Sequence, residues 1–147
     1  MAEISAQVEL RVYVRPGQDP VALERAIAAE GRRAAREFYL WVLETKDEQA
    51  VTTAGGARQR REARWVATLF GRVRIRRYRI NHEAESFHPL DRALGLGRGE
   101  ASQAVRVLVR ELAQRLSHRD VARAVTAITG EPITYQHVNR LLRQYRN

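Results

Sequence analysis

Residues 72–80, RVRIRRYRI, restrict the fold of this chain more than any other stretch, because arginine alternates with apolar residues along most of it. Successive side chains of an extended strand point to opposite faces, so a period of two predicts a strand with one charged and one apolar face. Five of the eight residues from 72 to 79 are arginine, and like charges that share a face repel one another. An anionic partner lying against that face would offset the repulsion.

A second strand-like run, Arg64–Phe70, meets this one at Gly71, and the two together predict a β-hairpin. At a rise of ~3.3 Å per residue, arginines two positions apart repeat about every 6.6 Å, close to the spacing of successive phosphates along one nucleic-acid strand. An ordinary solvated sheet face is the alternative. The phosphate contacts predicted from this run are Arg72, Arg74, Arg76, Arg77 and Arg79.

The positive charge is concentrated in the second part of the chain. Residues 1–57 hold seven Lys or Arg and nine Asp or Glu, a net charge of −2, whereas residues 58–147 hold nineteen and eight, a net charge of +11. A localised basic region is typical of proteins that bind nucleic acid. Because 25 of the 26 basic residues are arginine, a merely basic surface encoded by an arginine-rich gene is the alternative.

The first 61 residues predict a strand, a helix and a linker. Ile4–Val14 alternates apolar and polar residues, which is typical of a half-buried strand. Asp19 and Pro20 then favour the start of a long helix that we expect to reach about Lys46. Residues 1–48 are therefore predicted as a strand plus long helix that serves packing or homo-oligomerisation. Residues 49–61 lack periodicity and contain Gly-Gly, so they are predicted as a flexible linker.

The last third predicts three helices after a basic hairpin and connection at residues 62–99. Apolar residues recur every three or four positions from Glu100 to Leu116, and Ser117, Gly130 and Thr134 supply cap signals for the helices that follow. This order resembles a helix-turn-helix unit, predicted over residues 100–147, whose last helix would enter the major groove of DNA. A plain three-helix packing module is the alternative. The base-reading residues predicted on the last helix are Tyr135, Gln136, Asn139, Arg140 and Arg143.

Three blocks in this order resemble a known family. They are TLFGRVRIRRYRI, then PLDRALGL, then LVRELAQRLSHRDVARAVTAITGEPITYQHVNRLL. The blocks are similar to the N-terminal, DNA-binding region of bacterial insertion-sequence transposases of the Lre/Kra type. Residues that match the family pattern are Thr68, Phe70, Gly71, Arg77, Tyr78, Leu90, Asp91, Leu94, Gly95, Leu96, Ser117, Arg119, Ala122, Thr129, Gly130, Ile133 and Val138.

The resemblance implies a DNA-binding region that precedes an RNase-H-like DDE catalytic domain, as in the recombination of mobile elements. The sequence ends at Asn147, and no dispersed Asp, Asp and Glu follow to hold two metal ions. We therefore expect a chain that binds double-stranded DNA with sequence preference and is not an enzyme, as a truncated, domesticated or expressed part of a transposase. A protein-interaction module with a basic surface, and a fragment of an active transposase, are the alternatives.

The remaining expectations concern cofactors and location. The chain has no cysteine, which excludes disulfides and thiolate metal sites, and we expect no cofactor or metal. It has no apolar run of the ~20 residues needed to cross a bilayer and no signal-peptide pattern at its start. A cytoplasmic, nucleoid-associated α+β protein is therefore the prediction, with an N-terminal strand and long helix, a basic β-hairpin and a C-terminal helix-turn-helix-like unit.

Overall fold

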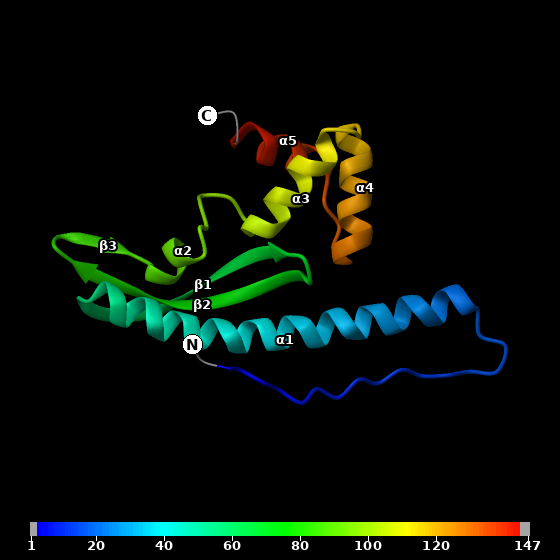
Figure 1. Cartoon of the computed structure of the whole chain (residues 1–147), viewed down its shortest axis with the longest axis horizontal. Helices are drawn as coiled ribbons and strands as arrows, with labels where there is room; N and C mark the ends of the chain where they lie inside the picture. Colours follow the sequence, from blue (N-terminus) through cyan, green and yellow to red (C-terminus); the bar gives the residue numbers. More distant parts are fainter. Residues whose placement is uncertain (1–2, 145–147) are drawn as a thin grey trace.

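The computed structural model describes residues 3–144 and has a mixed α+β architecture (Figure 1). A three-stranded antiparallel sheet in the order β1-β2-β3 is combined with five helices. The sheet lies along α1, and α3, α4 and α5 gather over the end of the sheet away from β3 and α2. The elements are α1 (Pro20–Ala54), β1 (Ala57–Thr68), β2 (Gly71–His82), β3 (Glu85–Phe87), α2 (Pro89–Ala93), α3 (Gln103–Ala113), α4 (His118–Thr129) and α5 (Tyr135–Gln144).

The sheet has one buried and one exposed face over most of the β1–β2 pair. Its register places Val66 opposite Val73 and Trp65 opposite Arg74, so these two pairs lie on opposite faces. On the buried face, which we call the inner face, β-strand valines and Ile75 pack with Leu43 of α1 and Leu90 of α2. Both helices therefore cover the same face of the sheet.

Helix α1 begins where the sequence predicts and ends later. Asp19 is its N-cap, accepting a hydrogen bond from the Val21 N–H at 3.2 Å, and Pro20 is its first residue. The helix continues to Ala54, and β1 starts at Ala57. The prediction of a flexible linker over residues 49–61 is therefore wrong, because the Gly-Gly pair breaks regular structure only at the pair itself. Both glycines, Gly55 and Gly56, have positive φ, which turns the chain from helix to strand.

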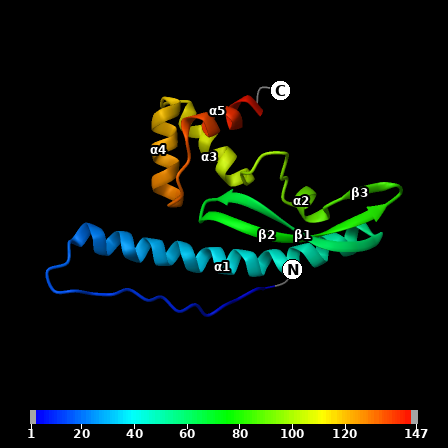
Figure 2. The ribbon, with the colours of Figure 1, turned by 180° about the vertical axis from the view of Figure 1, so that it is seen from behind.

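The predicted N-terminal strand is also absent. Residues 3–15 are extended, but in the described part of the chain they form no strand of the sheet (Figures 1 and 2). The segment instead runs beside α1, where the Arg33 guanidinium donates to the Glu9 carbonyl at 2.8 Å. Alternating apolar and polar residues favour an extended backbone, but they do not supply a neighbouring strand.

The C-terminal helices follow the predicted caps closely. Ser117 caps α4, its hydroxyl oxygen accepting from the Asp120 N–H at 3.2 Å, and Gly130 ends that helix in the left-handed conformation. Thr134 accepts from the His137 N–H at 3.2 Å at the start of α5. Val105, Val125 and Leu141, one from each helix, belong to a single buried cluster. Residues 145–147, the end of the predicted third helix, lie outside the described residues.

The sheet and the three helices are joined at the edge of β1. Ala67 donates its N–H to the Glu100 carbonyl, and its carbonyl accepts from the Ser102 N–H, so the chain entering α3 pairs with the strand. No helix within residues 3–144 combines the length and hydropathy that a membrane span requires. In the same range, no cluster of His, Asp and Glu side chains is arranged to hold a metal ion.

Candidate nucleic-acid interface

The exposed face of the β1–β2 pair carries the predicted row of arginines. We define this outer face as Ala63, Trp65 and Ala67 of β1 with Arg72, Arg74 and Arg76 of β2, which alternate with the buried positions of both strands. Arg72 lies 3.8 Å from Glu100. Within residues 3–144, neither the Arg74 side chain nor the Arg76 side chain has an ion-pair or hydrogen-bond partner. Two of the three guanidinium groups thus face solvent without a local counter-charge.

A tryptophan lies in the middle of the outer face. Trp65 is opposite Arg74 in the register and 47% exposed, and the Arg72 guanidinium lies over its ring at 4.9 Å from the centroid. Sequence reasoning missed this residue as part of a site, although the hairpin register would have placed it there. The outer face therefore combines exposed guanidinium groups with one exposed aromatic ring.

Arg77 does not belong to the exposed row. It is 6% exposed and points to the inner face, where its Nε donates to Asp91 Oδ1 at 2.8 Å and its Nη1 donates to the Glu62 carbonyl at 2.8 Å. A guanidinium engaged in this way is not available to a phosphate, so the prediction for Arg77 is wrong. The sequence places Arg76 and Arg77 next to each other, and adjacent strand residues must face opposite sides.

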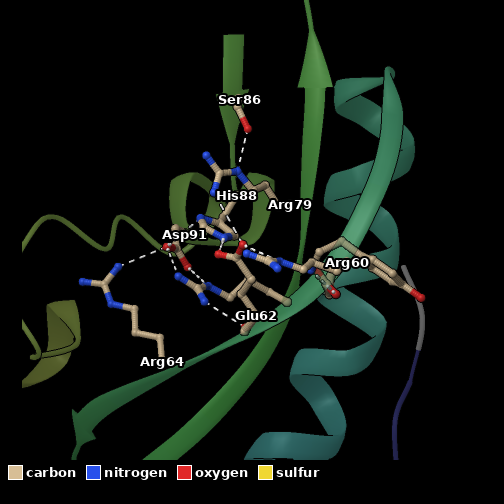
Figure 3. Close-up of polar contacts among 10 residues, drawn as sticks. Arg60, Glu62, Arg64, Arg79, Ser86, His88 and Asp91 are labelled. Atoms are coloured by element: carbon tan, nitrogen blue, oxygen red, sulfur yellow. Dashed lines mark hydrogen bonds and ion pairs between the residues drawn. The ribbon is translucent and has the colours of Figure 1, made fainter.

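Asp91 is the centre of a polar network beneath the sheet (Figure 3). Its carboxylate accepts from Arg77 and, at 3.1 Å, from Arg64. Burial alone would raise the pKa of Asp91, but the hydrogen bonds and positive charges of the two arginines outweigh it, so the pKa lies below its ordinary value. A carboxylate that was isolated in the sequence thus joins β1, β2 and α2.

Arg79 is partly engaged by the same network. His88 Nε2 lies 2.9 Å from Glu62, and that contact is the main reason why the pKa of Glu62 is lowered. Arg79 donates to the Ser86 hydroxyl at 2.6 Å and reaches Glu62 at 3.5 Å, with its side chain 40% exposed (Figure 3). It lies toward β3, away from the outer face, and is a weaker candidate for phosphate contact than Arg74 or Arg76.

The predicted base-reading side chains lie mainly on the solvent side of α5. Tyr135, Gln136, Arg140 and Arg143 are exposed, while Val138 and Leu141 are buried among α3 and α4. Asn139 is half-buried, and its side-chain amide oxygen contacts His118 of α4. That oxygen can therefore accept only one further hydrogen bond, for example from a DNA base. The Arg119 guanidinium lies 5.2 Å from the Tyr135 ring centroid and covers one side of it.

The outer face and α5 meet at His137. Burial lowers the pKa of this imidazole, and the charges of Arg140 and Arg72 lower it further. Arg72 comes from the sheet and Arg140 from α5, so both positive groups act on the same half-buried side chain. Ala67 and Arg72 of the outer face line one hollow with His137, and Glu100 and Ile133 also line it. The outer face therefore borders α5 at His137.

The fold and this surface define an α+β chain with a basic, exposed sheet face that is continuous with a helical unit. The chain is similar to a protein of Streptococcus gallolyticus named "UPF0236 protein in vanSb 3'region", with 34% identity over 101 residues. The match covers 65% of this chain and 22% of that protein, so the chain spans about a fifth of the length of this relative. No family model matches the chain, and no solved structure matches it.

Proposed function

We propose that this chain binds double-stranded DNA with sequence preference and without catalysing a reaction on it. Arg72, Arg74 and Arg76 would contact phosphates along one strand, and the solvent side of α5 would reach base edges in the major groove. The resemblance to the DNA-binding region of Lre/Kra-type transposases supports the same role. In a longer protein this region would hold DNA for a separate catalytic domain.

One observation carries the proposal. The unpaired guanidinium groups of Arg74 and Arg76 share a face that borders α5 where Arg72 and His137 line one hollow. A row of like charges with no local counter-charge is unfavourable in the free protein, and neutralising DNA phosphates would relieve it. Positive charge spread evenly over the molecule would not single out one face in this way.

The experiment that tests the proposal measures duplex affinity as a function of salt. In the variant with Arg72→Gln, Arg74→Gln and Arg76→Gln, we expect weaker binding to every duplex. The slope of log K against log salt should become less negative by roughly 0.9 for each lost phosphate contact, or about 2.7 for three. Fluorescence anisotropy of a labelled duplex from 50 to 300 mM salt, on the order of the physiological range, gives the slope.

The matched control removes the same charge elsewhere. Arg15, Arg25 and Lys46 are exposed and lie outside the outer face, so replacing all three by glutamine should change the slope much less. Equal changes in both triple variants would mean that net charge alone governs binding, and the assignment of the outer face would then be wrong.

Trp65 favours a second candidate, a single-stranded nucleic acid. An exposed aromatic ring among arginines provides both the stacking surface and the backbone charge that such ligands use. If this candidate is correct, Trp65→Ala should weaken binding of a single-stranded oligonucleotide by about 1–3 kcal/mol and leave binding of the corresponding duplex nearly unchanged. Anisotropy with the two forms of one sequence distinguishes the candidates, because tighter binding of the duplex than of the single strand supports the first.

A further inference from the structure

The extended segment of residues 3–15 is attached to α1 by its backbone at neighbouring odd-numbered positions. The Glu9 carbonyl accepts from Arg33, and the Arg11 N–H donates to Glu30 at 3.4 Å. In an extended chain, the N–H and carbonyl of one residue point to the same edge, and those of the next residue point to the opposite edge. The odd-numbered residues here use the edge that faces α1.

The other edge of the segment has no partner in this chain. The backbone groups of Val8, Leu10 and Val12 point to it, and among residues 3–144 none of these groups forms a hydrogen bond. The apolar side chains of the segment are also incompletely covered, with Val8 45%, Leu10 55% and Val14 76% exposed. The segment therefore has the side-chain pattern and one free edge of a strand, without a neighbouring strand.

Self-pairing gives a register with complementary charges. When two copies of the segment run antiparallel around a two-fold axis at Leu10, Glu9 of each copy lies opposite Arg11 of the other. The same register sets Ala6 opposite Val14, Val8 opposite Val12 and Leu10 opposite itself, so every pair on that face is apolar. A shift by two residues in either direction would place Glu9 opposite Glu9, or Arg11 opposite Arg11, and like charges in direct opposition are destabilising.

We propose that a second copy of this chain occupies the free edge, through antiparallel pairing of residues 5–15 centred on Leu10. The even-numbered residues form the ladder, since their backbone groups are the free ones, and each odd-numbered edge stays on its own α1. The result is a two-stranded ribbon between two α1 helices. The pairing uses no residue of the outer face or of α5, so it stands independently of DNA binding.

Cysteine cross-linking tests both the contact and its register, because the chain has no cysteine of its own. Leu10→Cys places two thiols on the two-fold axis. Cα atoms of a hydrogen-bonded antiparallel pair lie about 5.5 Å apart, within the range of about 4.4–6.8 Å that a disulfide spans. We expect mild oxidation to convert this variant to a covalent dimer, visible on a non-reducing gel.

Two controls test whether cross-linking follows the proposed register. Val14→Cys is at least as exposed but lies opposite Ala6, so alone it should stay monomeric. Val8→Cys and Val12→Cys should each stay monomeric alone and form a mixed disulfide when the two proteins are combined. Equal cross-linking of every cysteine variant, or no cross-linking of Leu10→Cys, would overturn the proposal.

A charge exchange provides a second test that requires no oxidation. Glu9→Arg and Arg11→Glu should each raise the dimer dissociation constant at least tenfold, measured by sedimentation equilibrium at low salt. The double variant should recover most of the affinity. Both changes keep the carbonyl of residue 9 and the amide of residue 11 that contact α1, although each single change also breaks the ion pair between Glu9 and Arg11 within one chain. A wild-type protein that remains monomeric at high concentration, or a double variant no better than the single ones, would contradict the pairing.

Discussion

At the scale of single residues, the ion pair between Arg77 and Asp91 shows that an arginine in a basic run can serve the fold. Arg77 has a side-chain exposure of 7% and Asp91 of 14%, and the two make a bidentate contact. Arg77 belongs to the first sequence block that resembles the transposase family, and Asp91 belongs to the second. Their contact joins these two blocks in the fold. Thr68 and Gly71, from the first block, are likewise joined by the Thr68 hydroxyl donating to the Gly71 carbonyl. These shared residues therefore support a similar fold more directly than a similar function.

Asp91→Ala should be one of the most destabilising single changes in the chain. Removing one partner of a buried pair leaves the other charge uncompensated, so we expect a loss of about 3–5 kcal/mol in the free energy of unfolding, measured with urea. The control is Glu85→Ala, which breaks a surface ion pair with Arg92 whose side chains are more than half exposed, and which should cost less than about 1 kcal/mol.

The same carboxylate predicts how stability depends on pH. Its pKa in the folded protein is below the value of about 3.9 expected in the unfolded chain, so its contribution is complete above that value and is lost as the pH falls through the folded pKa. Urea unfolding from neutral pH down to about pH 2 should therefore show a steeper acid loss in the wild type than in Asp91→Asn. Parallel curves for the two proteins would exclude Asp91 as the source.

At the scale of helices and strands, the sequence was most informative where the signal is local. Ser117, Gly130 and Thr134 act within one helical turn of their partners, and each is a cap in the structure. The partner of Arg77 lies 14 residues away, and the α1 residues that contact the segment of residues 3–15 lie 19 and 24 residues away. Long-range partners of this kind cannot be read from periodicity, which explains the missing strand. The period of two does separate Arg77 from Arg76, but it does not show that Arg77 is buried against Asp91.

Two glycines in the helical elements should respond oppositely to alanine. Gly31 lies inside α1 and has open space around the position of a Cβ atom, so Gly31→Ala should stabilise the protein by about 0.5–1 kcal/mol. Gly130 has φ +74° and a Cβ there would collide with the Arg32 side chain, so Gly130→Ala should destabilise by about 1 kcal/mol or more. Thermal unfolding of the two variants measures both effects, and a loss in Gly31→Ala would contradict the continuous helix.

At the scale of the whole molecule, the surface around His137 and the free edge at residues 3–15 differ in chemistry and would bind different partners. The first is basic and lies on the sheet and α5, whereas the second is apolar and lies beside the N-terminal half of α1 (Figure 1). A pair of chains joined at the second surface would carry two copies of the first. Two-fold symmetry in the protein would then be matched by two-fold symmetry in its target.

If both proposals hold, fragments selected by the wild-type protein from a random duplex library should contain inverted repeats. Arg11→Glu should select single half-sites, because it prevents pairing and leaves α5 unchanged. Arg140→Ala should keep the repeat but relax the preference at one base pair in each half by about 1–3 kcal/mol. Sequencing the bound fragments measures all three results. If the wild type and Arg11→Glu select the same single half-sites, pairing of residues 5–15 plays no part in DNA recognition.

Helix α1 is unbroken over 35 residues and therefore measures about 52 Å at ~1.5 Å per residue. Its length exceeds a full turn of B-DNA, about 34–36 Å. In a dimer, the two α1 helices would hold the outer face and α5 of each copy at a fixed separation, without a flexible linker between the copies. Target sites whose halves are spaced by a different number of base pairs would then be rejected by geometry, even when each half is a perfect match.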